Sequence, residues 1–239
     1  MRINIKNVIK IILLLQFPVL CQYNGNDFSI GVYGVYTTSA SIFLNPNASD
    51  VVIRNQAFVL EDILNPAADI RVRVSEPLII GLNIEYIEKT ESSPNLTAFV
   101  GGSVVRLKVE DGFNLIPVEL TAYYVLPFST EGWKFLMGGG LGYYNGEFIR
   151  KVADTEVSTV QREAEFGIQV SASMDFVPIN QIVIRFQMKF RDPEFTVTSQ
   201  YDQQEIDYQG HTILLPGDSF DTKINMDGIT FMLGAAVQF

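Results

Sequence analysis

The end of the chain alternates between apolar and small or polar side chains, and this pattern constrains the fold more than any other feature. Residues 226–239 read MDGITFMLGAAVQF. A period of two over this length is typical of a β-strand with one apolar face. The run exceeds an ordinary strand of about five or six residues, and it matches the roughly nine to eleven that a tilted strand needs to cross a membrane. Every second residue, counted back from the end, is apolar: Phe239, Val237, Ala235, Leu233, Phe231 and Ile229.

The composition agrees with a membrane-spanning β-barrel. The 239 residues include 17 Phe, 10 Tyr and 18 Gly, and only 18% are charged. No apolar run reaches the roughly 18 residues of a helical span, because the apolar side chains are spread over alternate positions, as in membrane barrels. The formal net charge of −10 excludes a basic nucleic-acid footprint. We therefore expect no nucleic-acid partner.

The N-terminus has the pattern of a secretory signal peptide. Arg2, Lys6 and Lys10 precede a mostly apolar stretch at residues 11–20. Cleavage ahead of Gln22 would leave residues 1–21 as the signal peptide and 22–239 as one barrel domain. Cys21 is the only cysteine, so the mature chain would have no thiol; the alternative is a lipoprotein with Cys21 lipidated.

Seven further segments alternate in the same way and are separated by connections that are short and long in turn. Short turns are predicted at residues 75–77, 127–132 and 178–181. Long loops are predicted at residues 39–69, 88–114, 145–163 and 192–225. They include a short helix near 56–64, a hairpin extension within 88–114, and an upper strand before the acidic loop of 192–225. In lipid every backbone polar group must be paired, so such a sheet has to close. The sequence therefore predicts an all-β fold, an eight-stranded antiparallel transmembrane β-barrel with both termini in the periplasm. Its strands fall at residues 27–38, 70–74, 78–87, 116–126, 133–143, 166–176, 182–191 and 226–239.

The faces opposite the apolar ones carry charges of both signs. An eight-stranded barrel is just wide enough for its own side chains to fill, so we predict a packed ionic core rather than an open pore. Buried charges need partners, and we expect cross-strand pairs, among them Arg71 or Arg73 with Glu85. The predicted lumen network comprises Arg71, Arg73, Glu85, Glu119, Lys134, Asp175, Arg185, Lys189 and Arg191.

Aromatic residues near the strand ends favour lipid outside the barrel. Membrane barrels carry aromatic girdles at both interfaces. A soluble lipocalin-like barrel with its apolar face inside is the alternative, since it shows the same period. The predicted girdle residues are Tyr33, Tyr36, Trp133, Tyr143, Tyr144, Phe190 and Phe195.

Two runs in the middle of the chain support a more specific resemblance. Residues 114–128 (NLIPVELTAYYVLPF) and 133–146 (WKFLMGGGLGYYNG) resemble the fourth and fifth strands of the small OmpW/OmpX-like outer-membrane barrels. The terminal Phe adds to this resemblance, which implies a location in the bacterial outer membrane, in contact with its lipid. It also implies that the barrel-insertion machinery reads the last strand, with Phe231, Leu233, Val237 and Phe239 as its signal.

The same resemblance implies passage of small hydrophobic compounds, which enter from outside and leave sideways into the membrane. An apolar pocket near the outer rim would fit that role. The alternative is a closed structural or surface-interaction barrel that acts through its extracellular loops. Candidate pocket residues are Phe43, Leu44, Phe58, Leu60, Leu141, Phe148 and Ile149.

No group of residues indicates an enzyme. His211 is the only histidine and lies in a polar stretch without an obvious catalytic partner. Acidic residues around it could attract divalent cations, but their spacing is not that of an EF-hand, and a solvated loop explains them equally. We therefore expect no catalytic residues, no cofactor and no metal site. The acidic residues are Asp202, Glu205, Asp207, Asp218 and Asp221.

Overall fold

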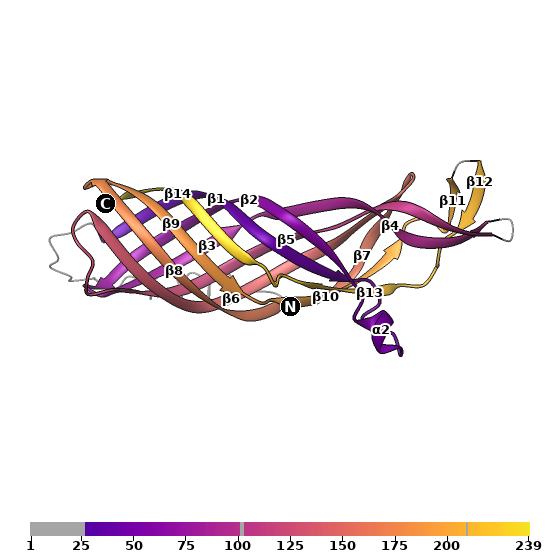
Figure 1. The fold of residues 1–239 in the computed structure, drawn as a ribbon, viewed down its shortest axis with the longest axis horizontal. Coiled ribbons are helices and arrows are strands. Elements are labelled where there is room, and N and C mark those ends of the chain that lie inside the picture. The colour runs from indigo at the N-terminus through magenta and orange to yellow at the C-terminus, as the bar shows by residue number, and fades with distance from the viewer. Residues whose placement is uncertain (1–26, 101–102, 209) are drawn as a thin grey trace, which may run out of the picture.

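A computed structural model describes residues 27–100, 103–208 and 210–239, so the predicted signal peptide lies outside the described residues. Within them, eight antiparallel strands close into a ring in which each pairs with two neighbours (Figure 1). Closure leaves no edge with unpaired backbone groups inside the ring. The ring runs through β1 (Phe28–Phe43), β2 (Ala57–Ser75), β3 (Leu78–Glu85), β5 (Ser103–Val125), β6 (Trp133–Val152), β8 (Glu165–Ile179), β9 (Ile182–Arg191) and β14 (Ile229–Gln238), which pairs with β1 again.

Beyond the ring the same wall continues as an outer extension, after short interruptions. At one interruption, Pro193 has no N–H to donate to a ladder. The hairpin of β11 (Glu205–Tyr208) and β12 (His211–Leu214) lies at the far end of this extension. The short helix α2 (Val51–Arg54) lies at the other end of the extension, close to the ring (Figure 1). We call the opposite end of the ring, which carries the tight turns, the lower mouth. The extension consists of the upper parts of β1, β2, β5 and β6 with β4 (Ile87–Val100), β7 (Thr155–Arg162), β10 (Glu194–Tyr201) and β13 (Phe220–Asn225).

The ring has an apolar outer surface and a polar interior. Its outward side chains are apolar and alternate on most strands with buried polar ones, such as Arg185, Gln187 and Lys189 on β9, which excludes the lipocalin-like alternative for this part of the chain. Among the described residues no helix is long and apolar enough to cross a membrane. The outward apolar residues include Ile30, Val32, Ile70, Leu82, Leu120, Met137, Ile168, Val170 and Leu233.

Three of the predicted long loops are wrong in extent, and one of them, residues 192–225, is mostly occupied by β10 to β13. The strands β1 and β2 continue through most of residues 39–69, and β6 and β7 fill most of residues 145–163. The predicted helix near 56–64 is also wrong, because that segment belongs to β2 and the helix lies at Val51–Arg54. Here Asp50 caps the helix by accepting a hydrogen bond from the N–H of Val52 at 2.7 Å. The hairpin extension within 88–114 is present as β4 and β5.

The aromatic girdle is smaller than the sequence predicted. Tyr36, Trp133, Tyr143 and Phe190 lie on the outer surface, and Trp133 packs on Phe176 with ring centroids 4.6 Å apart. Three others are buried because, in the alternation of side chains along their strands, they fall at positions that point into the barrel: Tyr33, Tyr144 and Phe195.

Candidate functional site

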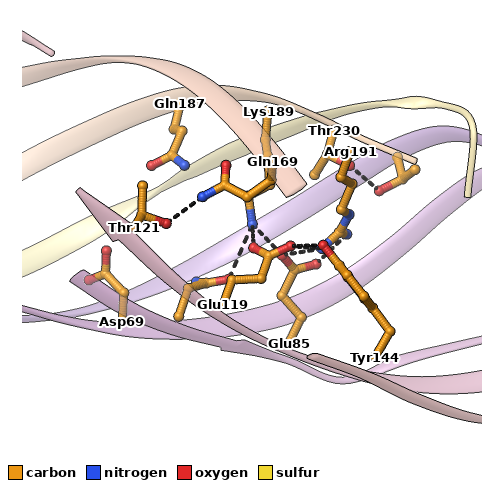
Figure 2. A network of polar contacts seen from close by, with 12 residues as sticks. Asp69, Glu85, Glu119, Thr121, Tyr144, Gln169, Gln187, Lys189, Arg191 and Thr230 are labelled. Carbon is orange, nitrogen blue, oxygen red and sulfur yellow. Dashed lines mark hydrogen bonds and ion pairs between the residues drawn. The ribbon is translucent and has the colours of Figure 1, made fainter. Parts of the chain in front are cut away.

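The upper half of the lumen holds a compact network of two carboxylates and two cations. Lys189 Nζ lies 2.8 Å from Glu85 Oε1 and also contacts Glu119, and Arg191 bridges the same carboxylates at 2.8 and 2.9 Å (Figure 2). The Tyr144 hydroxyl donates to Glu119 at 3.0 Å. All four charged side chains are buried. Since each charge faces two of the opposite sign, the network is neutral, as burial of charge requires, although Nε of Arg191 has no hydrogen-bond partner among the described residues.

A second network lies below it, toward the lower mouth. Arg185 forms a two-pronged pair with Asp175 at 2.8 Å for both contacts, and it reaches Asp69 at 3.2 Å. Arg71 pairs with the same Asp69 at 2.7 Å. The Tyr33 hydroxyl donates to Asp69 and accepts from Arg185, both at 2.7 Å. Side chains from β1, β2, β8 and β9 thus meet across the lumen.

A polar and aromatic layer fills the space between and beside these networks. Gln187 accepts a hydrogen bond from Arg71 at 2.7 Å, and the Tyr123 ring lies 4.0 Å below the Arg71 guanidinium. Glycine makes room for this ring, since a Cβ at Gly138 would approach it to 2.7 Å and one at Gly81 to 2.8 Å. The two networks and this layer together form what we call the ionic plug, whose charged side chains are buried inside the ring.

The plug differs from the sequence prediction in its pairing. Arg71 and Glu85 are not partners, because the β2–β3 register sets Arg71 opposite Gly81 and Glu85 opposite Ala67. Asp69 is the partner that the sequence analysis missed, although it shares the face of Arg71 and Arg73 at a spacing of two. Tyr144 could have been found by the same parity argument. The other predicted lumen residues Lys134 and Arg73 lie near the lower mouth without an ion pair among the described residues.

Above the plug the interior becomes apolar. Tyr144 stands at the boundary, with its hydroxyl in the plug and its ring in the apolar layer. Of the predicted pocket residues, Leu60 and Phe148 belong to this layer, and Leu44 and Phe58 pack against it. Leu141 instead lies on the outer surface, 65% exposed. We call the layer the upper apolar cluster: Ala40, Ile42, Leu60, Ile63, Ile87, Phe113, Leu115, Tyr144, Phe148, Phe195, Val197, Ile224 and Met226.

The wall beside this cluster has an unpaired seam between β2 and β4. Pairing of β2 with β3 ends at Ala67 and Glu85, and one further backbone bond joins Tyr86 to Pro66 at 3.2 Å. Above it, residues 57–65 of β2 pair with β1, and no described residue of β4 pairs with them. Lys89 Nζ crosses the seam to the Asp62 carbonyl at 3.4 Å.

Apolar side chains approach the seam from inside and from outside. Ile63 on β2 and Ile87 on β4 are fully buried in the upper apolar cluster. On the outer surface, Leu64 and Pro66 also line a groove of about 630 Å³, which extends from β2 over β1, β14 and β9, on the side of β2 away from β4. This groove also includes the aromatic residues Tyr36, Phe186 and Phe231, and its lining is largely apolar.

The predicted insertion signal lies on the lipid-facing surface of the closing strand. Phe239 is 67% exposed, and its backbone N–H bonds the Phe28 carbonyl at 2.8 Å. Leu233 and Val237 are exposed in the same belt, and Phe231 is half-buried there. His211 lies exposed in β12, and no cluster of three or more potential metal ligands occurs among the residues described.

Comparison with solved structures finds the same architecture. The outer membrane protein OprG from Pseudomonas aeruginosa superimposes with a TM-score of 0.59 at 13% identity, covering 90% of this chain and 96% of that one. The chain has the fold of a small outer-membrane β-barrel. The localisation predicted from the sequence, a bacterial outer membrane, agrees with this fold and with the apolar belt.

Two further solved structures superimpose less well. Neisserial surface protein A gives a TM-score of 0.49 at 10% identity, covering 89% of this chain and 97% of that one. The outer membrane protein AlkL gives 0.47 at 13% identity, covering 94% and 95%. No family model matches the sequence, and no curated protein matches it.

Proposed function

We propose that this barrel takes up small apolar molecules from outside the cell and releases them sideways into the outer membrane through the seam between β2 and β4. The observation that carries the proposal is the change of the interior from ionic to apolar at the level where the wall loses its pairing. The insertion machinery and the membrane lipid are the other partners we expect, and we expect no enzymatic activity.

The ionic plug makes the sideways route the favourable one for an apolar molecule. A molecule moving further down would have to separate buried ion pairs, and an uncompensated buried charge costs several kcal/mol. A molecule leaving through the seam passes from the upper apolar cluster to the apolar interior of the membrane. It therefore keeps the free energy of roughly 25 cal/mol per Å² of apolar surface that it gained on leaving water. Ile63 and Ile87 flank the seam from inside, and Leu64 and Pro66 continue the apolar path outside.

Opening the seam breaks few hydrogen bonds. The cluster is packed in this conformation, so passage requires Ile63 and Ile87 to part. Between paired strands such a movement would break a ladder of backbone bonds, each worth about 1 kcal/mol net. Above the Tyr86–Pro66 bond, the hydrogen bond described across the seam is that of Lys89 to the Asp62 carbonyl. This wall should therefore open more easily than the fully paired walls beside the cluster.

The test is to close the seam covalently and measure uptake. Refolded residues 22–239 carry no native cysteine, so Asp62→Cys with Lys89→Cys can be joined by a short bismaleimide. Cross-linking should reduce the rate at which an apolar dye enters proteoliposome membranes about tenfold or more. An increase of about 1.4 kcal/mol in the free-energy barrier to opening the seam is enough for a tenfold change. A small sugar should not cross in either state, because the plug fills the lumen.

A matched cross-link controls for the chemistry. Ser39→Cys with Glu61→Cys joins β1 and β2, which already pair at these positions. Its cross-linking should leave dye uptake unchanged. Equal uptake with the seam open and closed would refute the lateral route, and leakage of the sugar would refute the filled plug.

A second candidate, a surface-interaction protein, is favoured by the separately packed outer extension. It has its own apolar cluster, which includes Val109, Tyr201 and Ile213. A buried Arg150–Asp111 pair at 2.6 and 2.8 Å adds to it. Such packing gives the extension a defined shape for a partner to bind. Absence of dye uptake in the unmodified protein would favour this function.

A further inference from the structure

The charges of the lumen do not balance at the lower mouth. In the upper network two carboxylates face two cations. At the lower mouth, four cations and two carboxylates line a small cavity, and a third carboxylate, Asp69, pairs with Arg71 and Arg185 from above. Both carboxylate oxygens of Asp175 accept hydrogen bonds of 2.8 Å from Arg185. The charged residues that line the cavity are Arg71, Arg73, Lys134, Arg185, Asp27 and Asp175.

Two of these cations have no counter-ion within ion-pair distance among the residues described. Arg73 Nε is buried and has no hydrogen-bond partner there, and Lys134 is half-buried without an ion pair. Arg71 is only 3% exposed, and its Nη1 is also without a partner, although its Nε is paired. A buried cation without a partner is costly. Arg71, Arg73 and Lys134 line the same cavity, which therefore has an excess of positive charge.

The cavity has the size and lining of a carboxylate site. Its volume of about 30 Å³ exceeds the roughly 10–15 Å³ that one water needs, so it accommodates a small head group and not a whole metabolite. Arginine presents planar paired donors that match the two oxygens of a carboxylate. Apolar side chains of Ile79 and Val183 line the same cavity beside the cations and suit the first carbons of an aliphatic acid.

We propose that the lower mouth binds the carboxylate of a small aliphatic acid between Arg73, Lys134 and the free side of Arg71. The acid would come from the compartment below the ring, the periplasm if the predicted orientation holds. This site is separated from the upper apolar cluster by the ionic plug. It therefore does not rest on the lateral route, and either proposal can fail without the other.

The direct test uses butyrate as the probe and butyramide as its uncharged counterpart. Refolded residues 22–239 in an uncharged detergent are titrated while the side-chain Nε–H resonance of Arg73 is followed by NMR. Butyrate should shift this resonance in a saturable way, and butyramide should not. Equal binding of butyramide would overturn the proposal. Full displacement of butyrate by equimolar chloride would also overturn it, since the site would then hold any small ion.

Variants show whether the cations act as binding groups. Arg73→Gln should weaken butyrate binding about tenfold, which corresponds to the loss of one charge-assisted hydrogen bond. Because the Arg73 resonance is then absent, binding is followed by the backbone amide resonances of the lower mouth. Lys134→Gln should also weaken binding. Arg162→Gln, which removes an exposed cation of the outer extension, should change the affinity less than twofold. Arg73→Gln should also unfold no more easily than the parent protein, because it removes an unpaired charge. Unchanged butyrate affinity in a folded Arg73→Gln protein would refute the site.

Discussion

Glu85→Gln is expected to lower the free energy of unfolding of the barrel by about 3–5 kcal/mol, the cost of removing one partner from a buried ion pair. The substitution keeps the side-chain volume, so the loss reports charge rather than packing. Lys189 and Arg191, both buried, would be left with Glu119 as their remaining carboxylate. Urea unfolding of the refolded protein, followed by fluorescence of Trp133, the single tryptophan, measures this change.

The double variant decides whether the network acts as a unit. Lys189→Met added to Glu85→Gln restores one cation facing one carboxylate, so the loss should be smaller than the sum of the single losses by about 2 kcal/mol. Purely additive losses would contradict the coupled plug. The control is Glu156→Gln, whose pair with Lys151 is exposed on the outer extension. It should cost less than about 1 kcal/mol.

Gly140→Ala is expected to destabilise the barrel by about 3 kcal/mol, the upper part of the usual cost of overpacking. A Cβ at this position would lie 2.1 Å from the backbone oxygen of Leu120 on β5. Since the obstacle is backbone, the β5–β6 pairing itself must shift. The fraction of protein that refolds, read from the heat-modifiable mobility of the barrel on gels, and the urea midpoint both measure the effect.

The neighbouring glycine provides a matched control in the same strand. Gly139 faces outward, and the nearest atom to a Cβ there is 4.0 Å away. Gly139→Ala should therefore leave stability unchanged or raise it slightly, because alanine restricts the unfolded chain more than glycine does. Equal destabilisation by both substitutions would show that the contact with the backbone oxygen of Leu120 is not the cause.

Short-range periodicity explains why so much of the ring was predictable. A period of two assigns every residue of a strand to one of two faces, so Ile30, Leu120 and Leu233 can be placed on the outer face from the sequence alone. The same parity places Glu119 and Lys189 inside. Once lipid requires closure of the sheet, the even number of such segments determines a barrel.

The outer extension was underestimated for a physical reason. In residues 57–65 and 145–152 the outward face carries charged residues, among them Glu61, Glu147 and Lys151, next to apolar ones such as Val59, so the alternation weakens there. Backbone pairing with a neighbour, such as Ser39 with Glu61, holds them as strands nevertheless. Pairing of this kind leaves no trace in the sequence of one strand.

By itself the sequence determined the strand pattern, the orientation of its faces and the lipid-facing belt that ends at Phe239, because these follow from local alternation and from the need to pair backbone groups in lipid. Only the tertiary structure decided which charges meet. Arg185 binds Asp69 and Glu85 binds Lys189 because strand register and closure of the ring bring distant strands together. For the same reason, the seam beside Ile63 and Ile87 and the unpaired cations of the lower mouth became visible only in three dimensions.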